Sequence, residues 1–329
     1  MERRGGMRIE LLDLIVCPDC QAPLDVVDPS MRGGEVQSGD LVSRGGGHRF
    51  RIRDYIPRFI DDDANADAFS LEWNTFRTAH LKRFTQLSYL EEQFDEFIDS
   101  RAERLNGKLV LDAGCGLGRF SEVVLDKGGS VVAVDPSYGI DAARENLHDR
   151  EGIPFIQADV FRLPFRDGSF DFVYSWGVLH HTPDPPQAFR QLPPLVRPGG
   201  KLMIFVYARY NKAYLATTNF YRRLTTRLPP TPIAEAVIHR PAALPRLLDT
   251  RSRAVHHPHP PTGKRPAPDA WLASGNTFDL YSPKYALACE HVEVYGWFEK
   301  AGLEAIRPVG AESGVSYIAT KPSVDSARW

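Results

Sequence analysis

The sequence predicts an α/β fold in which a doubly wound, seven-stranded sheet carries a small N-terminal β domain and a helical insertion after its fifth strand. Three observations lead to this fold class. Between residues 106 and 206, short apolar segments alternate with helical stretches, as in repeated βαβ units. A glycine-rich turn follows the first of these segments. A helix and two more apolar segments near residue 320 bring the expected strands to seven.

Short apolar segments bounded by polar or glycine-containing turns mark the expected strands. They lie at 109–112, 131–135, 155–158, 170–175, 201–207, 303–309 and 315–320. A helix is expected before the first strand, because apolar side chains recur there at helical spacing, namely Leu90, Phe94, Phe97 and Ile98. Residues 291–302 predict an amphipathic helix that ends at Gly302.

Composition changes along the chain divide it into five parts. The expected parts are an N-terminal β domain at 8–60, a helical cap or linker at 61–105, the main α/β core at 106–206, an insertion at 207–287 and the rest of the core at 288–321. The insertion is rich in aromatic residues and proline, and its HHPHPPTGKRPAP stretch does not suit regular structure. We therefore expect it to lie on the substrate side of the sheet as a lid.

Composition and charge narrow the class of protein. Lys and Arg number 40 against 42 for Asp and Glu, which gives a formal net charge of -2. This balance does not favour a nucleic-acid partner, since binding to phosphate backbones usually needs a basic surface. No apolar run reaches the roughly 18 residues that a membrane span requires, and the first residues lack a secretory signal. We expect a cytoplasmic protein without a membrane partner; no feature predicts an oligomeric state.

The glycine-rich turn is the most informative segment of the chain. In LVLDAGCGLGRF, a buried strand ends at Asp112 and is followed by glycines at alternate positions, Gly114, Gly116 and Gly118. Glycine lets the backbone turn sharply and lets a ligand approach the main chain. A dinucleotide-binding turn would need the spacing G-x-G-x-x-G, but Arg119 or Ser121 stands at the third position. The spacing therefore excludes that cofactor class.

The pattern D-x-G-x-G-x-G resembles the first motif of class I S-adenosylmethionine (SAM)-dependent methyltransferases, with a Rossmann-like core of the methyltransferase-11 (UbiE-like) type. Four later segments resemble the same family and occur in its order. They are VVAVDPS ending the second strand, QADVFRLPF after the third, FDFVYSWGVLHHTPDP around the fourth, and LVRPGGKLMIF before the fifth. The resemblance implies SAM as the cofactor.

The resemblance also implies which residues bind SAM. Gly114, Gly116 and Gly118 would line its methionine part, and Asp112 would orient the amino-acid end directly or through water. Asp135 at the end of the second strand would accept hydrogen bonds from the ribose hydroxyls. Asp159 and Val160 would contact adenine. Ser175, at the end of the fourth strand, completes the expected cofactor-binding set.

The N-terminal IVCPDCQAPLDV, followed by GHRFRIRDYIPRF, resembles the zinc-ribbon-like (Trm112-like) domain fused to some bacterial methyltransferases. In that pattern a second cysteine pair precedes the Gly-His, but here Ser43 and Gly46 stand at those positions. Zinc sites usually have four ligands. Cys17 and Cys20 supply two, His48 is a candidate third, and Asp19 is a poor fourth by spacing. We expect a vestigial pair and no metal, with a metal-bearing variant as the alternative.

Methyl transfer is an in-line displacement, in which alignment of the acceptor does most of the work. His180 and His181 follow the fourth strand, at the edge where such sheets bind ligands. Either imidazole could serve as a general base, because its pKa suits neutral pH. The alternative is that the pair only shapes the turn before a helix that begins near Asp184.

Aromatic side chains predict where the acceptor binds. Glu72 and Trp73, in FSLEWNTF, resemble an upstream segment that closes over the cofactor in related enzymes, although an amphipathic helix packed on the core is an equal alternative. Tyr207, Tyr210 and Tyr281 flank the insertion and are expected to line an aromatic pocket. The alternative is that these aromatics form the insertion's own core.

Together these features predict a SAM-dependent methyltransferase. The expected acceptor is a small apolar or aromatic molecule in a biosynthetic or secondary-metabolite pathway. Two alternatives remain open: an RNA (guanine) methyltransferase, suggested by the CPxC start, and a non-catalytic partner protein that keeps the SAM-binding fold. The sequence does not distinguish N-, O- and C-methylation.

Overall fold

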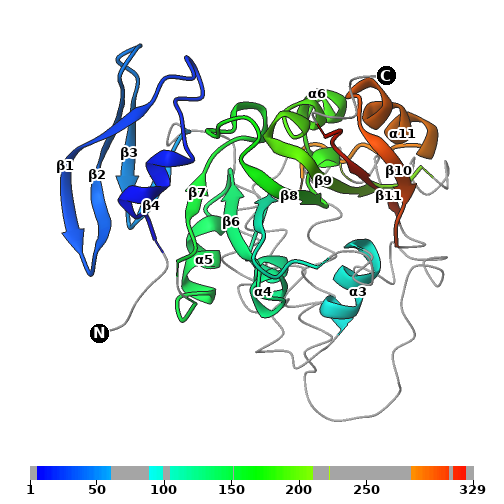
Figure 1. Ribbon diagram of the computed structural model, residues 1–329, viewed down its shortest axis with the longest axis horizontal. Helices are drawn as coiled ribbons and strands as arrows, with labels where there is room; N and C mark the ends of the chain where they lie inside the picture. Colours follow the sequence, from blue (N-terminus) through cyan, green and yellow to red (C-terminus); the bar gives the residue numbers. More distant parts are fainter. Residues whose placement is uncertain are drawn as a thin grey trace, which may run out of the picture.

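A computed structural model describes residues 6–60, 89–98, 104–150, 152–209, 222, 283–310 and 314–323. In these ranges one mixed sheet of 11 strands crosses the molecule (Figure 1). Its strand order is β1-β2-β3-β4-β7-β6-β5-β8-β9-β11-β10. The fold is therefore Rossmann-like α/β, but the expected count of seven strands is wrong for the sheet as a whole, since four N-terminal strands extend it.

Seven strands form the core part of the sheet. They are β5 (Leu109–Ala113), β6 (Ser130–Asp135), β7 (Phe155–Gln157), β8 (Phe170–Trp176), β9 (Val196–Tyr207), β10 (Glu304–Pro308) and β11 (Gly314–Thr320). The first five run parallel, and β11 pairs antiparallel with both β9 and β10. Strand β5 lies between β6 and β8, so the chain reverses its direction of winding there. Open α/β sheets bind ligands at such a switch point, beyond the carboxyl ends of the strands.

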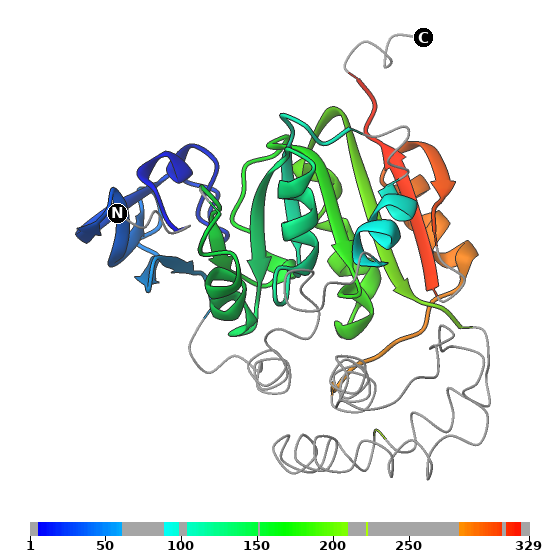
Figure 2. The same cartoon turned by 90° about the horizontal axis from the view of Figure 1, so that it is seen from below.

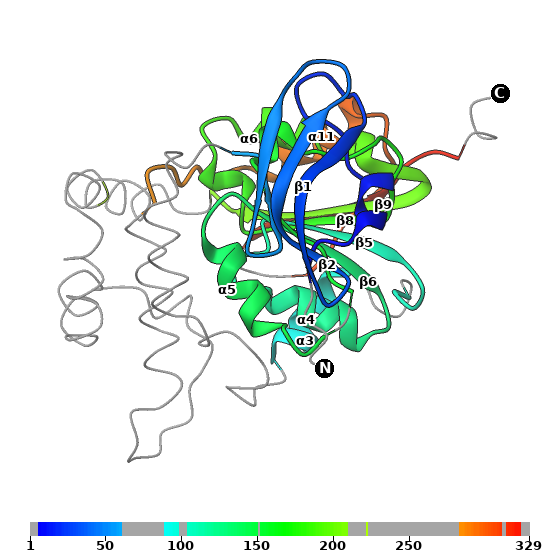
Figure 3. The same ribbon diagram turned by 90° about the vertical axis from the view of Figure 1, so that its left-hand side faces the viewer.

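The N-terminal module, residues 6–60, adds a 3-10 helix and four strands to one end of the sheet (Figure 3). These elements are η1 (Ile9–Asp13), β1 (Leu24–Arg32), β2 (Glu35–Ser43), β3 (Arg49–Arg53) and β4 (Ile56–Arg58). Strands β1 and β2 form a hairpin whose turn contains Gly33 and Gly34, both at positive φ. Glycine adopts this left-handed conformation without steric cost, which favours the turn at this position.

The module joins the core through β4, which pairs with β7 in parallel at Arg58 and Gln157. The Arg58 guanidinium is buried and donates to Gln157 Oε1 at 2.7 Å and to Asp141 Oδ1 at 2.6 Å. Backbone hydrogen bonds also join residues 14–16 to residues 164–166. Hydrogen bonds and an ion pair thus attach the module to the core.

Helices cover both faces of the core sheet (Figure 2). On one face lie α3 (Tyr89–Ile98), α4 (Arg119–Asp126) and α5 (Gly139–Asn146); on the other lie α6 (Pro185–Arg190) and α11 (His291–Lys300). Phe94, Phe97 and Ile98 of α3 are fully buried, which confirms the helix expected before the first strand. Helix α11 is followed by Gly302 at φ 68°, which confirms its predicted end.

Several sequence predictions concern residues outside the described ranges. They include most of the linker and of the insertion, with Glu72, Trp73, Tyr210 and Tyr281. These stay predictions. Among the described residues, no helix combines the length and apolar character needed to cross a membrane.

Candidate functional site

The glycine turn at the carboxyl end of β5 lies at the switch point of the sheet. Gly114, Gly116 and Gly118 all have positive φ, at 94°, 52° and 80°. A Cβ on Gly114 would lie 2.2 Å from Val178 Cγ2, far inside van der Waals contact. The chain therefore needs glycine here for both its backbone conformation and its close approach to the segment after β8.

Backbone hydrogen bonds fasten this turn to the neighbouring strand β6. The amides of Gly114 and Cys115 both donate to the carbonyl of Val134, at 2.8 and 2.9 Å. The next amide, that of Gly116, donates to Asp135 Oδ2 at 2.9 Å. The turn and the acidic residue that ends β6 thus form one hydrogen-bonded unit.

Asp135 is held firmly at the tip of β6. Its second carboxylate oxygen accepts from the backbone amide of Ser137 at 2.8 Å and from the Ser137 hydroxyl. Burial raises the pKa of Asp135, while the hydrogen bonds from Ser137 and Gly116 counteract this rise. A carboxylate fixed at this position is the group that can accept hydrogen bonds from a ribose diol.

Asp112 is the second buried carboxyl of the site. Only 3% of the residue is exposed, and its Oδ2 accepts from the Ser121 hydroxyl on α4 at 2.7 Å. Burial raises the pKa of Asp112 from 3.8 to about 6. Its ionised form therefore costs the folded protein free energy unless a cation lies nearby.

Two other predicted cofactor residues have clear local roles. Asp159 Oδ1 accepts from the amide of Phe161 at 3.0 Å and caps the 3-10 helix η2 (Val160–Arg162), whose Val160 is buried. The Ser175 hydroxyl is buried and donates to the carbonyl of Ala113 at 2.9 Å. Ser175 therefore links the ends of β8 and β5.

The two histidines predicted to be catalytic have different surroundings in the structure. His180, in η3 (Leu179–His181), is fully buried, and its ring centroid lies 3.8 Å from that of Tyr207. Burial, with His181 and Arg222 nearby, lowers the pKa of His180 well below its usual range. Neither ring nitrogen has a hydrogen-bond partner in the described part of the chain. A buried imidazole that resists protonation is disfavoured as a general base, and a catalytic role for His180 stays a prediction.

His181 makes a hydrogen bond that fixes the tautomer of its neutral ring, although its Nε2 is buried as well. Its Nδ1 lies 2.9 Å from the carbonyl oxygen of Tyr285. A carbonyl only accepts, so Nδ1 carries the proton and neutral His181 holds its lone pair on Nε2. The helix α6 after the pair starts behind Asp184, whose side chain accepts from the amide of Gln187, as the sequence predicts.

Three residues near this edge of the sheet were not anticipated. Ser137 positions Asp135, and Val178 packs over Gly114. The signal for Ser137 was its place two residues after Asp135, because an aspartate side chain commonly accepts a hydrogen bond from the backbone amide two residues further along the chain. No sequence signal identifies Val178, or the buried Arg222, because both depend on tertiary contacts.

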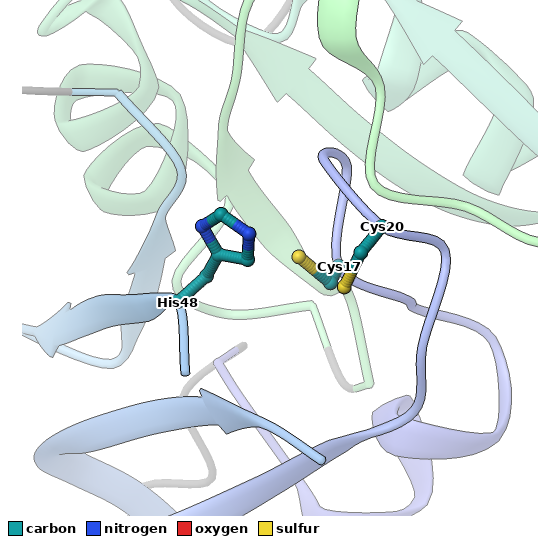
Figure 4. A group of neighbouring side chains, drawn as sticks. All are labelled: Cys17, Cys20 and His48. Carbon is teal, nitrogen blue, oxygen red and sulfur yellow. The ribbon is translucent and has the colours of Figure 1, made fainter. Parts of the chain in front are cut away.

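A separate group of potential metal ligands lies in the N-terminal module (Figure 4). One ligand atom from each of Cys17, Cys20 and His48 can be chosen so that all lie within 4.8 Å of one another. Two sulfurs and an imidazole suit a borderline-soft ion such as Zn²⁺. The sequence predicts a vestigial cysteine pair, but the structure places His48 beside it.

Comparison with protein families matches the two parts of the chain separately. Residues 111–204 match the family described as "Methyltransferase domain", and residues 8–54 match that described as "Trm112p-like protein". Within the core, residues 111–204 are thus similar to a methyltransferase domain. The residues matched by this methyltransferase domain include the glycine turn, Asp135 and both histidines.

The chain also resembles curated proteins over part of its length. The chain is 33% identical over 150 residues to a "Ubiquinone biosynthesis O-methyltransferase" of Coxiella burnetii, covering 44% of this chain and 60% of that protein. It is 37% identical over 123 residues to the protein of that name from Pseudomonas paraeruginosa, covering 36% of this chain and 52% of that protein. The chain thus spans little more than half the length of these relatives.

Solved structures with similar chains have low sequence identity to this one. One is magnesium protoporphyrin IX methyltransferase from Synechocystis PCC 6803 with bound SAH, at 14% identity and TM-score 0.46, covering 79% of this chain and 100% of that chain. Another is a complex between the Haloferax volcanii Trm112 methyltransferase activator and a putative methyltransferase, at 14% identity and TM-score 0.45 with the same coverage.

Proposed function

We propose that this protein transfers the methyl group of SAM to a hydroxyl of a small-molecule acceptor in a biosynthetic pathway. The observation that carries the proposal is the hydrogen-bonded unit formed by the glycine turn and Asp135. It presents main chain that lacks side chains at alternate positions, Gly114, Gly116 and Gly118, next to a fixed carboxylate. This combination suits a ligand that has both a ribose and an extended amino-acid arm.

The other predicted residues fit the remaining parts of SAM. Asp112, beside the same turn, would pair with the ammonium group, and that positive charge would favour its ionised form. Asp159 and Val160 follow β7, where adenine would lie. Bound SAM supplies an electrophilic methyl group on a sulfonium, so the protein has to align the acceptor and exclude water.

Oxygen is proposed as the nucleophile on two grounds. The curated relatives are named as O-methyltransferases of ubiquinone biosynthesis, and the hydrogen bond of His181 Nδ1 to a carbonyl leaves the lone pair of the neutral ring on Nε2. This atom is buried, so it would accept a hydroxyl proton only from an acceptor that enters beside the ring. Tyr207 ends β9 beside this pair, and its ring would help to line an apolar or aromatic acceptor site. Glu72, Trp73, Tyr210 and Tyr281 are proposed as further lining residues from the sequence alone.

Calorimetric titration with SAM and with S-adenosylhomocysteine tests the cofactor site. We expect saturable binding to the full chain, weakened at least about 100-fold by Asp135→Ala, since two hydrogen bonds to a charged group contribute roughly 1.5–3 kcal/mol each. Asp167→Ala removes an exposed carboxylate outside the site and serves as the matched control. Equal SAM affinity of the Asp135→Ala and control variants would show that the cofactor lies elsewhere.

Turnover measurements test the role of His181. With hydroxylated aromatic acceptors and labelled SAM, His181→Gln should lower kcat about 10²- to 10⁴-fold while SAM affinity stays unchanged. His148→Gln is the control, because His148 is exposed, is not among the proposed site residues and hydrogen-bonds the nearby carbonyl of Glu145. Unchanged kcat in His181→Gln would exclude proton transfer by this residue.

A further inference from the structure

We infer that Arg58 of the N-terminal module is a positioning residue for the carboxylate of Asp135. The inference rests on the proposed function, because that function assigns Asp135 to the ribose of SAM. Arg58 lies where β4 of the module meets β7 of the core (Figure 1). It acts through residues 136–138, the loop that joins β6 to α5, and not by contact with the ligand.

The loop of residues 136–138 holds the carboxylate of Asp135. The backbone amide and the hydroxyl of Ser137 both donate to Asp135 Oδ1, the amide at 2.8 Å. Ser137 Oγ in turn accepts from the amide of Gly139, the first residue of α5, at 3.0 Å. The direction of the carboxylate therefore depends on the position of this loop and of the start of α5.

One set of hydrogen bonds joins Arg58 to the beginning of the loop. Arg58 Nη1 donates to Gln157 Oε1 at 2.7 Å, and Gln157 Nε2 donates to the carbonyl of Pro136 at 3.1 Å. Arg58 and Gln157 are both buried. The backbone of Gln157 is fixed as well, since its carbonyl accepts from the amide of Phe59 at 2.8 Å. The side chain of Gln157 thus links Arg58 to the residue that directly follows Asp135.

Arg58 also contacts the other end of the loop. Its guanidinium binds both carboxylate oxygens of Asp141, in the first turn of α5, at 2.6 and 3.1 Å. Such a two-point contact fixes orientation as well as distance. Tyr138, the last residue of the loop, has its ring centroid 5.7 Å from Arg58 Cζ and 6.0 Å from Arg53 Cζ. Both distances are in the range of cation–π contacts.

One buried guanidinium therefore restrains the loop at both ends. A group that binds a ligand has to be held within about 0.5 Å of its productive position. Without Arg58 the loop is less restrained, and the carboxylate of Asp135 loses part of its preorganisation. The affinity lost should then be that of ligands that carry the ribose hydroxyls. A contact that only joins module to core would not distinguish such ligands from others.

Calorimetric titration of the full chain with two ligands tests this inference. One ligand is S-adenosylhomocysteine, and the other is its dideoxy analogue, which lacks both ribose hydroxyls. Arg58→Met removes the guanidinium. Gln157→Glu keeps an oxygen that accepts from Arg58 but cannot donate to Pro136. Each variant should weaken binding of S-adenosylhomocysteine about tenfold and that of the analogue by under about twofold.

Two controls separate positioning from a loss of stability. Leu41→Ala shortens a buried side chain of β2, two strands away from β4 in the sheet, and should destabilise the module but leave both affinities unchanged. In an Asp135→Ala background, Arg58→Met should cause no further loss of S-adenosylhomocysteine affinity. Circular dichroism at the titration temperature checks that each variant is folded. If Arg58→Met is not, Gln157→Glu carries the test.

The outcomes distinguish this inference from the proposed function. If the parent protein binds both ligands equally, Asp135 does not bind the ribose, and both proposals are overturned. If the parent prefers S-adenosylhomocysteine but the folded variants keep that preference in full, the ribose assignment stands and only the positioning role of Arg58 is overturned. A reduced preference in the Arg58→Met and Gln157→Glu variants, with Leu41→Ala unchanged, supports the inference.

Discussion

Neutralising Asp112 should stabilise the protein and at the same time impair its cofactor site. The carboxyl is almost fully buried, and burial raises its pKa from 3.8 to about 6. Because the folded-state pKa lies above the unfolded value, the contribution of Asp112 to stability is complete below pH 3.8 and is lost as the pH rises through about 6. Asp112→Asn keeps the size of the side chain and an oxygen that accepts from Ser121.

The size of this effect follows from the shift. One pKa unit corresponds to about 1.36 kcal/mol. A rise in the pKa of Asp112 from 3.8 to about 6 on folding therefore lowers the free energy of unfolding by about 3 kcal/mol at pH 7.5. At pH 5 the folded carboxyl is largely protonated, and the cost is about half as large. Asp112→Asn should therefore raise the free energy of unfolding by up to about 3 kcal/mol at pH 7.5 and by less at pH 5.

Urea denaturation at both pH values, without SAM, measures this difference. Asp167→Asn, at an exposed carboxyl, is the control and should change stability little at either pH. The reasoning is refuted if Asp112→Asn is no more stable than the parent at pH 7.5, or if its gain is the same at pH 5. Calorimetry on the same variant should show weaker SAM binding, since the charge proposed to pair with the ammonium group is lost.

Two further substitutions test the glycine turn and the joint between module and core. Gly114→Ala should lower the free energy of unfolding by about 2–4 kcal/mol, because alanine is strained in the left-handed conformation and its Cβ would clash with Val178. Recovery of part of this stability on adding Val178→Ala would confirm the clash. An unchanged free energy of unfolding in Gly114→Ala would contradict it. Arg58→Met should cost about 1–3 kcal/mol in urea denaturation, because it leaves the partly buried carboxylate of Asp141 without its partner. Arg44→Met, which breaks an exposed ion pair, should lower the free energy of unfolding by under about 1 kcal/mol. Equal losses of stability in Arg58→Met and Arg44→Met would contradict a stabilising role for the contact of Arg58 with the core.

The sequence predicts the core well because its signals are local. Short apolar segments define the seven core strands, and each lies within five residues of its expected limits. The glycine turn follows from steric rules that act within a few residues. Asp135 is predictable because the end of a strand fixes where its last side chain lies.

Features that depend on distant contacts were missed. Strand β4 has only three residues, IPR, and its pairing with β7 depends on Gln157, 99 residues away. The burial of His180 depends on Tyr207, which the adjacent strand supplies. The approach of His48 to the cysteines results from the absence of a side chain at Gly46, which a ligand-spacing argument does not register.

The pairing of β4 with β7 means that β4 is synthesised well before its partner strand. The ribosome completes the N-terminal module long before it makes Gln157, so one side of β4 emerges with no strand to pair with. Unpaired strand edges are prone to join other chains. A strand of three residues exposes few donors, and Pro57 has no amide hydrogen to offer. The short, proline-containing edge thus limits misassociation while the nascent chain waits for its partner strand.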